Sequence, residues 1–157
     1  GFFLNNELIN FSTRPMTDGR PTANRVEPNK RPRSAMAPTI VLNTDDDSLK
    51  MLTGSSGGSS IIGHIAQSVW NVLEFGLDAQ EAINVPHYQN QNGNTELEEP
   101  IDGITLDYNV EGLKDALEDD YGHDVSIGQI SSGLAVIVVD GDNLVGGADP
   151  RRDGIVA

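Results

Sequence analysis

Apolar and polar residues follow one another along the chain in short blocks, and the spacing within each block predicts the first strands. Residues 10–32 are interrupted by prolines and by Asp-Gly and Pro-Asn pairs, which predicts a long loop. The segment from Met36 to Leu42 contains a β-branched run and predicts a strand. A turn over Asn43 to Asp47 and a second strand over Leu49 to Thr53 are expected to follow.

Two helices are predicted after these strands. Ser59 or Ser60 can cap a helix that extends to about Gly76. Its apolar residues recur at helical spacing: Ile61, Ile62, Ile65, Val69, Val72 and Leu73. Asp78 is placed to cap a shorter helix that ends at Asn84.

The next part of the chain predicts a loop, a strand and an acidic helix. Residues 87–94 are polar and are expected to form a loop, and Thr95 to Leu97 form a short strand candidate. Val110 to Tyr121 has the pattern of an amphipathic helix that ends at Gly122. The residues that this pattern directs inward are Leu113, Ala116 and Leu117.

The C-terminal part of the chain predicts a hairpin. The continuous apolar run from Leu134 to Val139 is typical of a fully buried strand. Gly141 and Asp142 form a turn candidate, after which Leu144 and Val145 return. Strands, then helices, then strands indicate a layered α+β or α/β arrangement.

The composition is that of one globular domain with a core of its own. The chain has 157 residues, of which 37% are hydrophobic and 22% are charged. The absence of Cys excludes disulfides, a thiolate nucleophile and cysteine-ligated metals, and no apolar run is long enough for a membrane span. Because the chain starts at Gly1 and enters an apolar run at Phe2, we expect it to be a fragment of a larger protein.

The charge is acidic overall but uneven. The formal net charge of −14 disfavours nucleic-acid and anionic membrane partners. Residues 1–40 carry six basic against three acidic side chains, whereas the rest of the chain carries four against 21. The basic stretch could face a carboxylate substrate or an acidic partner surface, or it could be a solvated loop.

The Gly/Ser segment from Gly54 to Ser60 contains the most chemical information. A strand, a glycine turn and a capped helix place backbone N–H groups where they can bind a phosphate or a developing oxyanion. The segment lacks the lysine of a phosphate-binding P-loop. It satisfies the G-x-S-x-G pattern of a serine nucleophile at Ser56, with His87 or His123 downstream, although few residues precede it. The glycines could also serve only the tight turn.

Other candidate residues offer weaker signals. His64 lies in the predicted helix and is interpreted as a surface or hydrogen-bonded core residue, while His87 and His123 are isolated in the sequence. No spacing of His, Asp and Glu indicates a metal site, and residues 45–47 are interpreted as a solvated acidic turn. Trp70 is expected to lie in the core.

Four separated motifs occur in the order seen in one enzyme family. They are LNNELINFS from Leu4, PNKRPRSAMAPTIV from Pro28, TGSSGGSSII from Thr53 and GADPRR from Gly147. Together they resemble the small subunit of the γ-glutamyltranspeptidases, and the resemblance covers essentially the whole chain. The resemblance implies one domain over residues 1–157, which would be most of that catalytic subunit.

The resemblance implies an α+β fold that is part of the four-layer αββα sandwich of N-terminal nucleophile hydrolases. Such a precursor cuts itself, and the new N-terminal Thr transfers or hydrolyses the γ-glutamyl group of glutathione-like amides. Its free α-amine can serve as the base, so no cofactor is implied. No threonine of the chain is N-terminal, so the nucleophile segment and the large subunit, the expected partner, are missing from it. The isolated chain is therefore expected to be inactive, and export to the periplasm or the outside of the cell is implied.

Matched to the family motifs, Gly57 and Gly58 are the pair whose backbone N–H groups form the oxyanion hole. Ser56 stands where the family commonly has Pro, which argues for a turn residue and against a nucleophile. Arg151 and Arg152 are expected to hold the C-terminal turn together rather than to touch substrate.

Four further positions match the family's substrate-binding residues. Glu7 and Asn10 match the pair that holds the substrate α-amino group, and Asn10 departs from the usual Asp. Ser34 matches the first of two serines near the α-carboxylate, and Ala35 replaces the second. Both departures predict altered donor selectivity. They leave open a glutaryl-type cephalosporin acylase. The apolar start of the chain, Phe2-Phe3-Leu4, leaves open a non-catalytic fragment that only associates with its partner subunit.

Overall fold

The computed structural model describes residues 4–156, so Phe2 and Phe3 lie outside the described residues. The contacts within the chain group it into two units, residues 1–35 and residues 36–157. This grouping does not test the expectation of a single domain, which stays a prediction.

Unit one consists mainly of irregular chain, as the prolines and turn pairs predicted. It begins with a short 3-10 helix, η1 (Glu7–Asn10), and contains one small hairpin of β1 (Met16–Thr17) and β2 (Arg20–Pro21). The hairpin turns at Asp18 and Gly19, both of which have positive φ angles. The side chain of Asn24 donates to the carbonyl of Asn10 at 2.6 Å and so ties the end of η1 to the loop.

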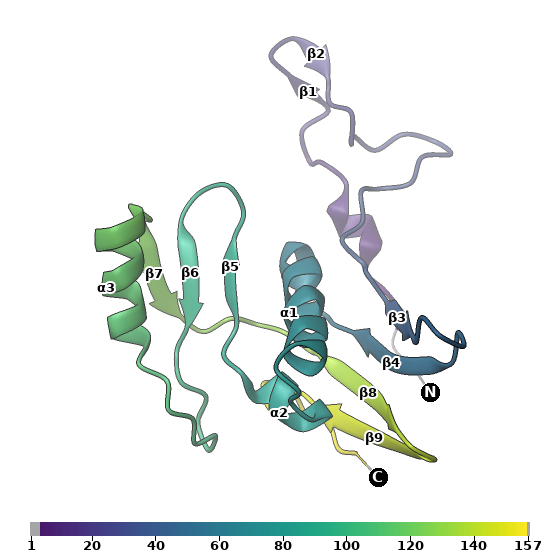
Figure 1. Cartoon of the computed structure of the whole chain (residues 1–157). Helices are drawn as coiled ribbons and strands as arrows, with labels where there is room; N and C mark the ends of the chain where they lie inside the picture. Colours follow the sequence, from purple (N-terminus) through teal and green to yellow (C-terminus); the bar gives the residue numbers. More distant parts are fainter. Residues whose placement is uncertain (1–3, 157) are drawn as a thin grey trace. The chain divides into compact units, whose positions relative to one another are not determined.

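Unit two contains a four-stranded antiparallel sheet in the order β3-β4-β8-β9 (Figure 1). Its strands are β3 (Thr39–Leu42), β4 (Leu49–Gly54), β8 (Ala135–Asp140) and β9 (Asn143–Ala148). The helices α1 (Ile61–Leu73) and α2 (Ala79–Asn84) pack on the sheet. The core between these layers is formed by Met51, Ile61, Ile65, Ala79, Ile83, Leu134 and Val136.

The expectation that residues 134–139 form a fully buried strand is wrong. In β8 the burial alternates: Val136 is fully buried, whereas Ile137 is 37% exposed. Side chains of a strand point to opposite faces in turn, and α1 and α2 cover the face on which Val136 lies. The opposite face carries exposed apolar residues, among them Ile40.

A second, three-stranded sheet in unit two has the order β5-β6-β7. It comprises β5 (Tyr88–Asn90), β6 (Thr95–Glu98) and β7 (Val125–Gly128). The β6–β7 pair is parallel and is connected through α3 (Val110–Tyr121), as a parallel pair requires a crossover. The prediction of a loop over 87–94 is therefore wrong in part, because β5 pairs with β6, and β7 was not predicted.

The ends of the helices show which of the predicted capping residues form caps. Asp78 and Glu81 form a capping box at the start of α2, which confirms the predicted cap. Gly122 ends α3 in the left-handed conformation, also as predicted. Ser60 precedes α1 but makes no side-chain cap, because its hydroxyl donates to Gln89 and a 3-10 turn, η2 (Gly58–Ser60), leads into the helix instead.

Two expected burials are not observed. Trp70 is 57% exposed and packs edge-to-face against Phe75, because α1 turns this side away from the sheet. Of the predicted inward residues of α3, Leu117 packs against the core of the second sheet, whereas Leu113 is 41% exposed. No helix within residues 4–156 has the length and apolarity required to cross a membrane.

Candidate active site

The glycine turn between β4 and α1 presents two backbone donors. Gly57 has φ 128° and ψ 16°, and Gly58 has φ +60°. Among the described residues, neither N–H group donates a hydrogen bond, whereas the N–H of Ser60 bonds the carbonyl of Gly57 at 3.2 Å. Adjacent unpaired N–H groups beside a helix N-terminus favour negative charge. The turn therefore presents donors that are suited to an anion, and the oxyanion role of this pair stays a prediction.

The surroundings of Gly57 explain why this position requires glycine. A Cβ atom added there would lie 2.9 Å from the carbonyl oxygen of Ser131 and 3.0 Å from Cε1 of His64. Its φ angle also lies outside the regions that other residues readily adopt. Gly58 has nothing within 4 Å of its Cβ position. The two glycines are thus constrained differently, Gly57 by packing and conformation and Gly58 by conformation only.

Gly133 supports the same turn from the other side of the loop. A Cβ atom on Gly133 would lie 2.3 Å from the hydroxyl oxygen of Ser56. The N–H of Ser56 donates to the Gly133 carbonyl at 3.4 Å. Ser56 therefore acts as a turn residue held against the segment that leads into β8, in agreement with the position it occupies in the motif.

Two histidines stack beneath the glycine turn. The rings of His64 and His87 have centroids 4.2 Å apart and planes 20° apart, and both side chains are buried. Burial lowers the pKa of His64, and it lowers the pKa of His87 to about 3, with the charges of Arg151 and His64 as smaller causes. Both rings are therefore neutral at physiological pH. The interpretation of His87 as isolated is wrong, and His64 is a core residue.

A buried serine and aspartate fix the His87 ring. The Ser132 hydroxyl donates to Oδ2 of Asp149, and His87 Nε2 lies 3.1 Å from the same hydroxyl oxygen. Since the one serine proton goes to Asp149, Nε2 of His87 is the donor to Ser132. Burial raises the pKa of Asp149, but its hydrogen bonds from Ser132 and from the backbone of Leu134 and Arg151 lower it overall. Asp149 is thus an ionised anchor.

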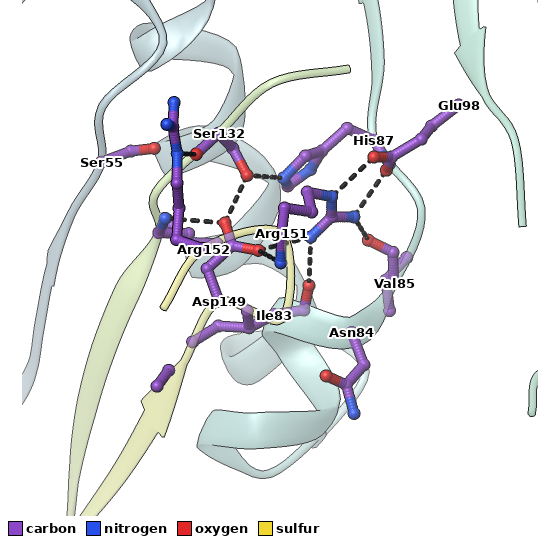
Figure 2. A network of polar contacts seen from close by, with 12 residues as sticks. Ser55, Ile83, Asn84, Val85, His87, Glu98, Ser132, Asp149, Arg151 and Arg152 are labelled. Atoms are coloured by element: carbon purple, nitrogen blue, oxygen red, sulfur yellow. Dashed lines mark hydrogen bonds and ion pairs between the residues drawn. The ribbon is translucent and has the colours of Figure 1, made fainter. Parts of the chain in front are cut away.

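Arg151 is the centre of the buried network (Figure 2). Its Nε and Nη2 atoms donate to the two carboxylate oxygens of Glu98 at 2.6 and 2.5 Å, and Nη1 donates to Asp149 at 3.1 Å. The same guanidinium donates to the carbonyls of Ile83 and Val85. Burial would lower the pKa of Arg151, yet the hydrogen bonds and charge of Glu98 raise it. This confirms that Arg151 holds the C-terminal turn together.

Arg152 completes the network at the segment beside Gly57. Its Nε donates to the Ser132 carbonyl at 2.6 Å, and its Nη2 donates to the Ser131 hydroxyl at 2.8 Å. Glu98 also accepts the backbone N–H of His87 at 2.6 Å. The ion pairs therefore link β6, α2 and the C-terminal turn to the residues under the glycine turn.

The serine-nucleophile alternative is not supported by these contacts. Nε2 of His87 faces Ser132, and Nδ1 of His123 lies 2.8 Å from the Thr95 hydroxyl. The Ser132–His87 pair is fully enclosed, with Ser132 wholly buried, so it cannot reach a substrate. Within residues 4–156 no cluster of three or more His, Asp or Glu side chains could hold a metal ion.

The predicted substrate-binding residues belong to unit one, whereas the glycine turn belongs to unit two. Glu7 and Asn10 begin and end η1, and residues three apart in a 3-10 helix lie on the same side, so these two are brought together. Ser34 is exposed and Ala35 is half-buried, both in irregular chain. The four assignments stay predictions, because they belong to a different unit from Gly57.

The side chains beneath the turn were missed from the sequence. His64, His87, Ser132 and Asp149 come from four separate segments, and no local pattern links them. The available signals were the excess of small and polar residues around Ser131 to Gly133 and the Asp149-Pro-Arg-Arg run. Both indicate a constrained, hydrogen-bonded turn.

The low pKa of His87 predicts acid sensitivity of the fold. Because the folded-state pKa of about 3 lies below the ordinary value of 6.5, the unfolded state binds the proton first as the pH falls. Stability is therefore lost from about pH 6.5 downward, by roughly 2 kcal/mol between pH 7 and pH 5 for this group. Asp149, whose pKa is lowered from 3.8, adds its loss only at lower pH.

Urea unfolding of the protein and of the non-titrating variant His87→Gln at both pH values checks this prediction. The variant is expected to lose less stability than the wild type over the same interval, although it is less stable at pH 7. Equal losses in the two proteins would contradict the assignment of the proton to His87.

The fold has relatives of known structure. A crystal structure of an acivicin-inhibited gamma-glutamyltranspeptidase matches with a TM-score of 0.75 and 31% identity over 98% of this chain and 82% of that one. Cephalosporin acylase from Bacillus halodurans matches with a TM-score of 0.71 and 26% identity, over 97% of this chain and 26% of that one. The fold is thus the α+β fold of the N-terminal nucleophile hydrolases.

Sequence comparison gives the family. The glutathione hydrolase proenzyme of Escherichia coli is 38% identical over 96% of this chain and 26% of its own length. The profile of the gamma-glutamyltranspeptidases matches residues 1–157. The chain belongs to the gamma-glutamyltranspeptidase family, as its motifs indicated. It spans about a quarter of the length of such proenzymes.

Proposed function

We propose that residues 1–157 are part of an enzyme that transfers or hydrolyses the γ-glutamyl group of glutathione-like amides. In this parent enzyme, Gly57 and Gly58 form the oxyanion hole, and the N-terminal Thr nucleophile comes from outside these residues. The large subunit of the same precursor is the partner, and the protein is exported. The observation that carries the proposal is the pair of adjacent, unpaired N–H donors on a turn whose glycine is fixed by packing.

The chemistry assigns each group a simple task. The threonine hydroxyl adds to the γ-carbonyl carbon, and its proton passes to the free α-amine, which then protonates the leaving amine. The carbonyl oxygen becomes negatively charged in the tetrahedral intermediate and accepts hydrogen bonds from the N–H groups of Gly57 and Gly58. Water or an acceptor amine then takes the acyl group from the threonine. This sequence needs neither a metal ion nor a cofactor.

Recognition of the amino-acid end is assigned to unit one. Glu7 and Asn10, on the same side of η1, receive the α-ammonium group, and Ser34 with Ala35 lies near the α-carboxylate. A carboxylate at Glu7 is suited to an ammonium, whereas the amide at Asn10 offers a neutral contact. The site is thus expected to select γ-glutamyl donors less strictly than one with Asp at position 10.

Asn10→Asp in the self-cleaved parent enzyme tests this assignment. A hydrogen bond between charged partners is worth roughly 1.5–3 kcal/mol against about 1 kcal/mol for a neutral one. Since each 1.4 kcal/mol is tenfold in rate, kcat/KM for γ-glutamyl relative to glutaryl anilides should rise about tenfold. Glutaryl anilide lacks the α-amine and is the matched control. A ratio equal to that of the wild type would show that position 10 does not contact the amine.

The chain without the rest of its parent is expected to be inactive. It carries the proposed oxyanion donors and binding residues but no N-terminal threonine. A chromogenic γ-glutamyl anilide assay of purified residues 1–157 should give no release above background. Turnover that disappears in Ser56→Ala would instead support the serine-nucleophile alternative.

A glutaryl-type cephalosporin acylase is the second candidate. Asn10 and Ala35 both remove contacts to the amino-acid end of the donor, and a glutaryl group has no α-amine to bind. The structural similarity to the Bacillus halodurans acylase supports the view that the same fold can serve either reaction. Comparing the two donors on the parent enzyme distinguishes the candidates, because an acylase would favour the glutaryl anilide.

A further inference from the structure

We propose that His64 is a positioning residue for the oxyanion hole: its buried ring, held between Gly57 and His87, fixes the orientation of Gly57 and of the two N–H donors. The inference rests on the proposed function for its catalytic consequence. The structural consequence, that this ring controls the conformation of the turn, rests only on the contacts of His64 with Gly57 and His87.

His64 lies in the first turn of α1 and is wholly buried. Its Cε1 and Nδ1 atoms lie 3.0 and 3.2 Å from the Cβ position of Gly57, and the Ser131 carbonyl oxygen lies 2.9 Å from the same point. The ring and this carbonyl therefore enclose one side of Gly57. With both in place, the glycine has no room to rotate toward the core.

The ring acts by packing. Within the described part of the chain, neither Nδ1 nor Nε2 of His64 has a hydrogen-bond partner. Burial lowers the pKa of the group by more than the nearby backbone of Ser56 raises it, so the ring is neutral. An enclosed polar side chain without a hydrogen-bond partner lowers stability rather than adding to it. The His64 ring provides a flat surface that stacks on His87 and contacts Gly57.

The platform under His64 is itself rigid. His87 donates to Ser132, Ser132 donates to Asp149, and Asp149 accepts from Arg151. Arg152 holds the backbone of Ser132 and the side chain of Ser131. Both walls that enclose Gly57 are thus anchored in the same ion-pair network.

Removing the ring should misplace the donors. A glycine with φ 128° is conformationally free, so His64→Ala opens space into which Gly57 can relax. A displacement of about 1 Å at a catalytic group can cost roughly 100-fold in rate. We expect kcat for the γ-glutamyl anilide to fall by about 10- to 100-fold, with KM within about twofold, because Glu7 and Ser34 are untouched.

The experiment compares three variants of the self-cleaved parent enzyme, each normalised to the concentration of cleaved, folded protein. His64→Ala removes the ring, and His64→Phe keeps a ring without nitrogen atoms. Ile65→Ala is the matched control, because Ile65 is the next residue of α1, is also buried and packs in the core under the sheet. The readouts are kcat, KM and hydrogen exchange of the peptide that contains residues 54–60.

We expect a low kcat only for His64→Ala. The kcat of His64→Phe should stay within about fivefold of the wild type, and that of Ile65→Ala should be near the wild type. Equal losses in His64→Ala and Ile65→Ala would overturn it, as would a His64→Phe variant no better than His64→Ala. Exchange of residues 54–60 should be at least tenfold faster in His64→Ala than in Ile65→Ala, and equal rates would overturn the control of the turn. If Gly57→Ala keeps the wild-type kcat, the proposed function fails, and the exchange rates decide the His64 proposal without it.

Discussion

Replacing Gly57 with alanine is expected to lower kcat of the parent enzyme by about 100- to 1000-fold, the usual loss when one oxyanion donor is removed, because the substitution moves the N–H group away from the oxyanion. The added Cβ would lie 2.9 Å from a backbone carbonyl and 3.0 Å from the His64 ring, so the turn must shift. The φ angle of 128° adds strain for any residue with a side chain. Steady-state kinetics on a γ-glutamyl anilide, normalised to cleaved enzyme, measures the effect.

Gly58→Ala is the matched control for this prediction. Its Cβ position is open, and its φ of +60° lies in the left-handed region, which alanine enters at a cost of about 1–2 kcal/mol. The N–H donor is kept, so kcat is expected to stay within about tenfold of the wild type. If the two substitutions cost the same, packing against His64 and Ser131 does not set the position of the donors.

Arg151→Met is expected to produce the largest loss of stability, about 3–5 kcal/mol, the range measured when one partner of a buried ion pair is removed. The substitution leaves the carboxylates of Glu98 and Asp149 buried and without their counter-charge, and it frees the carbonyls of Ile83 and Val85. Urea unfolding followed by circular dichroism measures the free energy of unfolding.

The same substitution at the next residue, Arg152→Met, provides the control. Arg152 is exposed and bonds a carbonyl and a hydroxyl rather than a carboxylate. The two hydrogen bonds that Arg152 donates to uncharged groups contribute less than the buried ion pairs of Arg151. The loss in the free energy of unfolding should therefore be about 1–3 kcal/mol. A loss at Arg151 no greater than that at Arg152 would show that the Arg151 network contributes little to the fold.

Much of the fold follows from local sequence signals. The α3 helix begins and ends where its pattern and Gly122 predicted, and the Asp78 cap of α2 forms as expected. The strands β5 and β7 were missed because they are short, and their residues form strands only through pairing with β6. The burial of β8 was overestimated, since a continuous apolar run cannot say whether one face or both faces are covered.

The candidate site could likewise be predicted only in part. The glycine turn could be predicted because its motif is continuous in sequence and its residue types fit one conformation. The histidine platform could not, because His64 and His87 meet only through tertiary packing, and their anchors Ser132 and Asp149 lie in later segments. An isolated histidine has no local signature of this kind of contact.

We propose that this chain belongs to an acyl-transfer enzyme for γ-glutamyl donors. This assignment is tested most directly by the intact mass of the small subunit of the self-cleaved parent, quenched in acid during turnover of a γ-glutamyl anilide. We expect a subunit heavier by one γ-glutamyl group, attached to the N-terminal threonine and lost on further hydrolysis. A cleaved, folded parent that shows no acyl adduct and releases no aniline would contradict it.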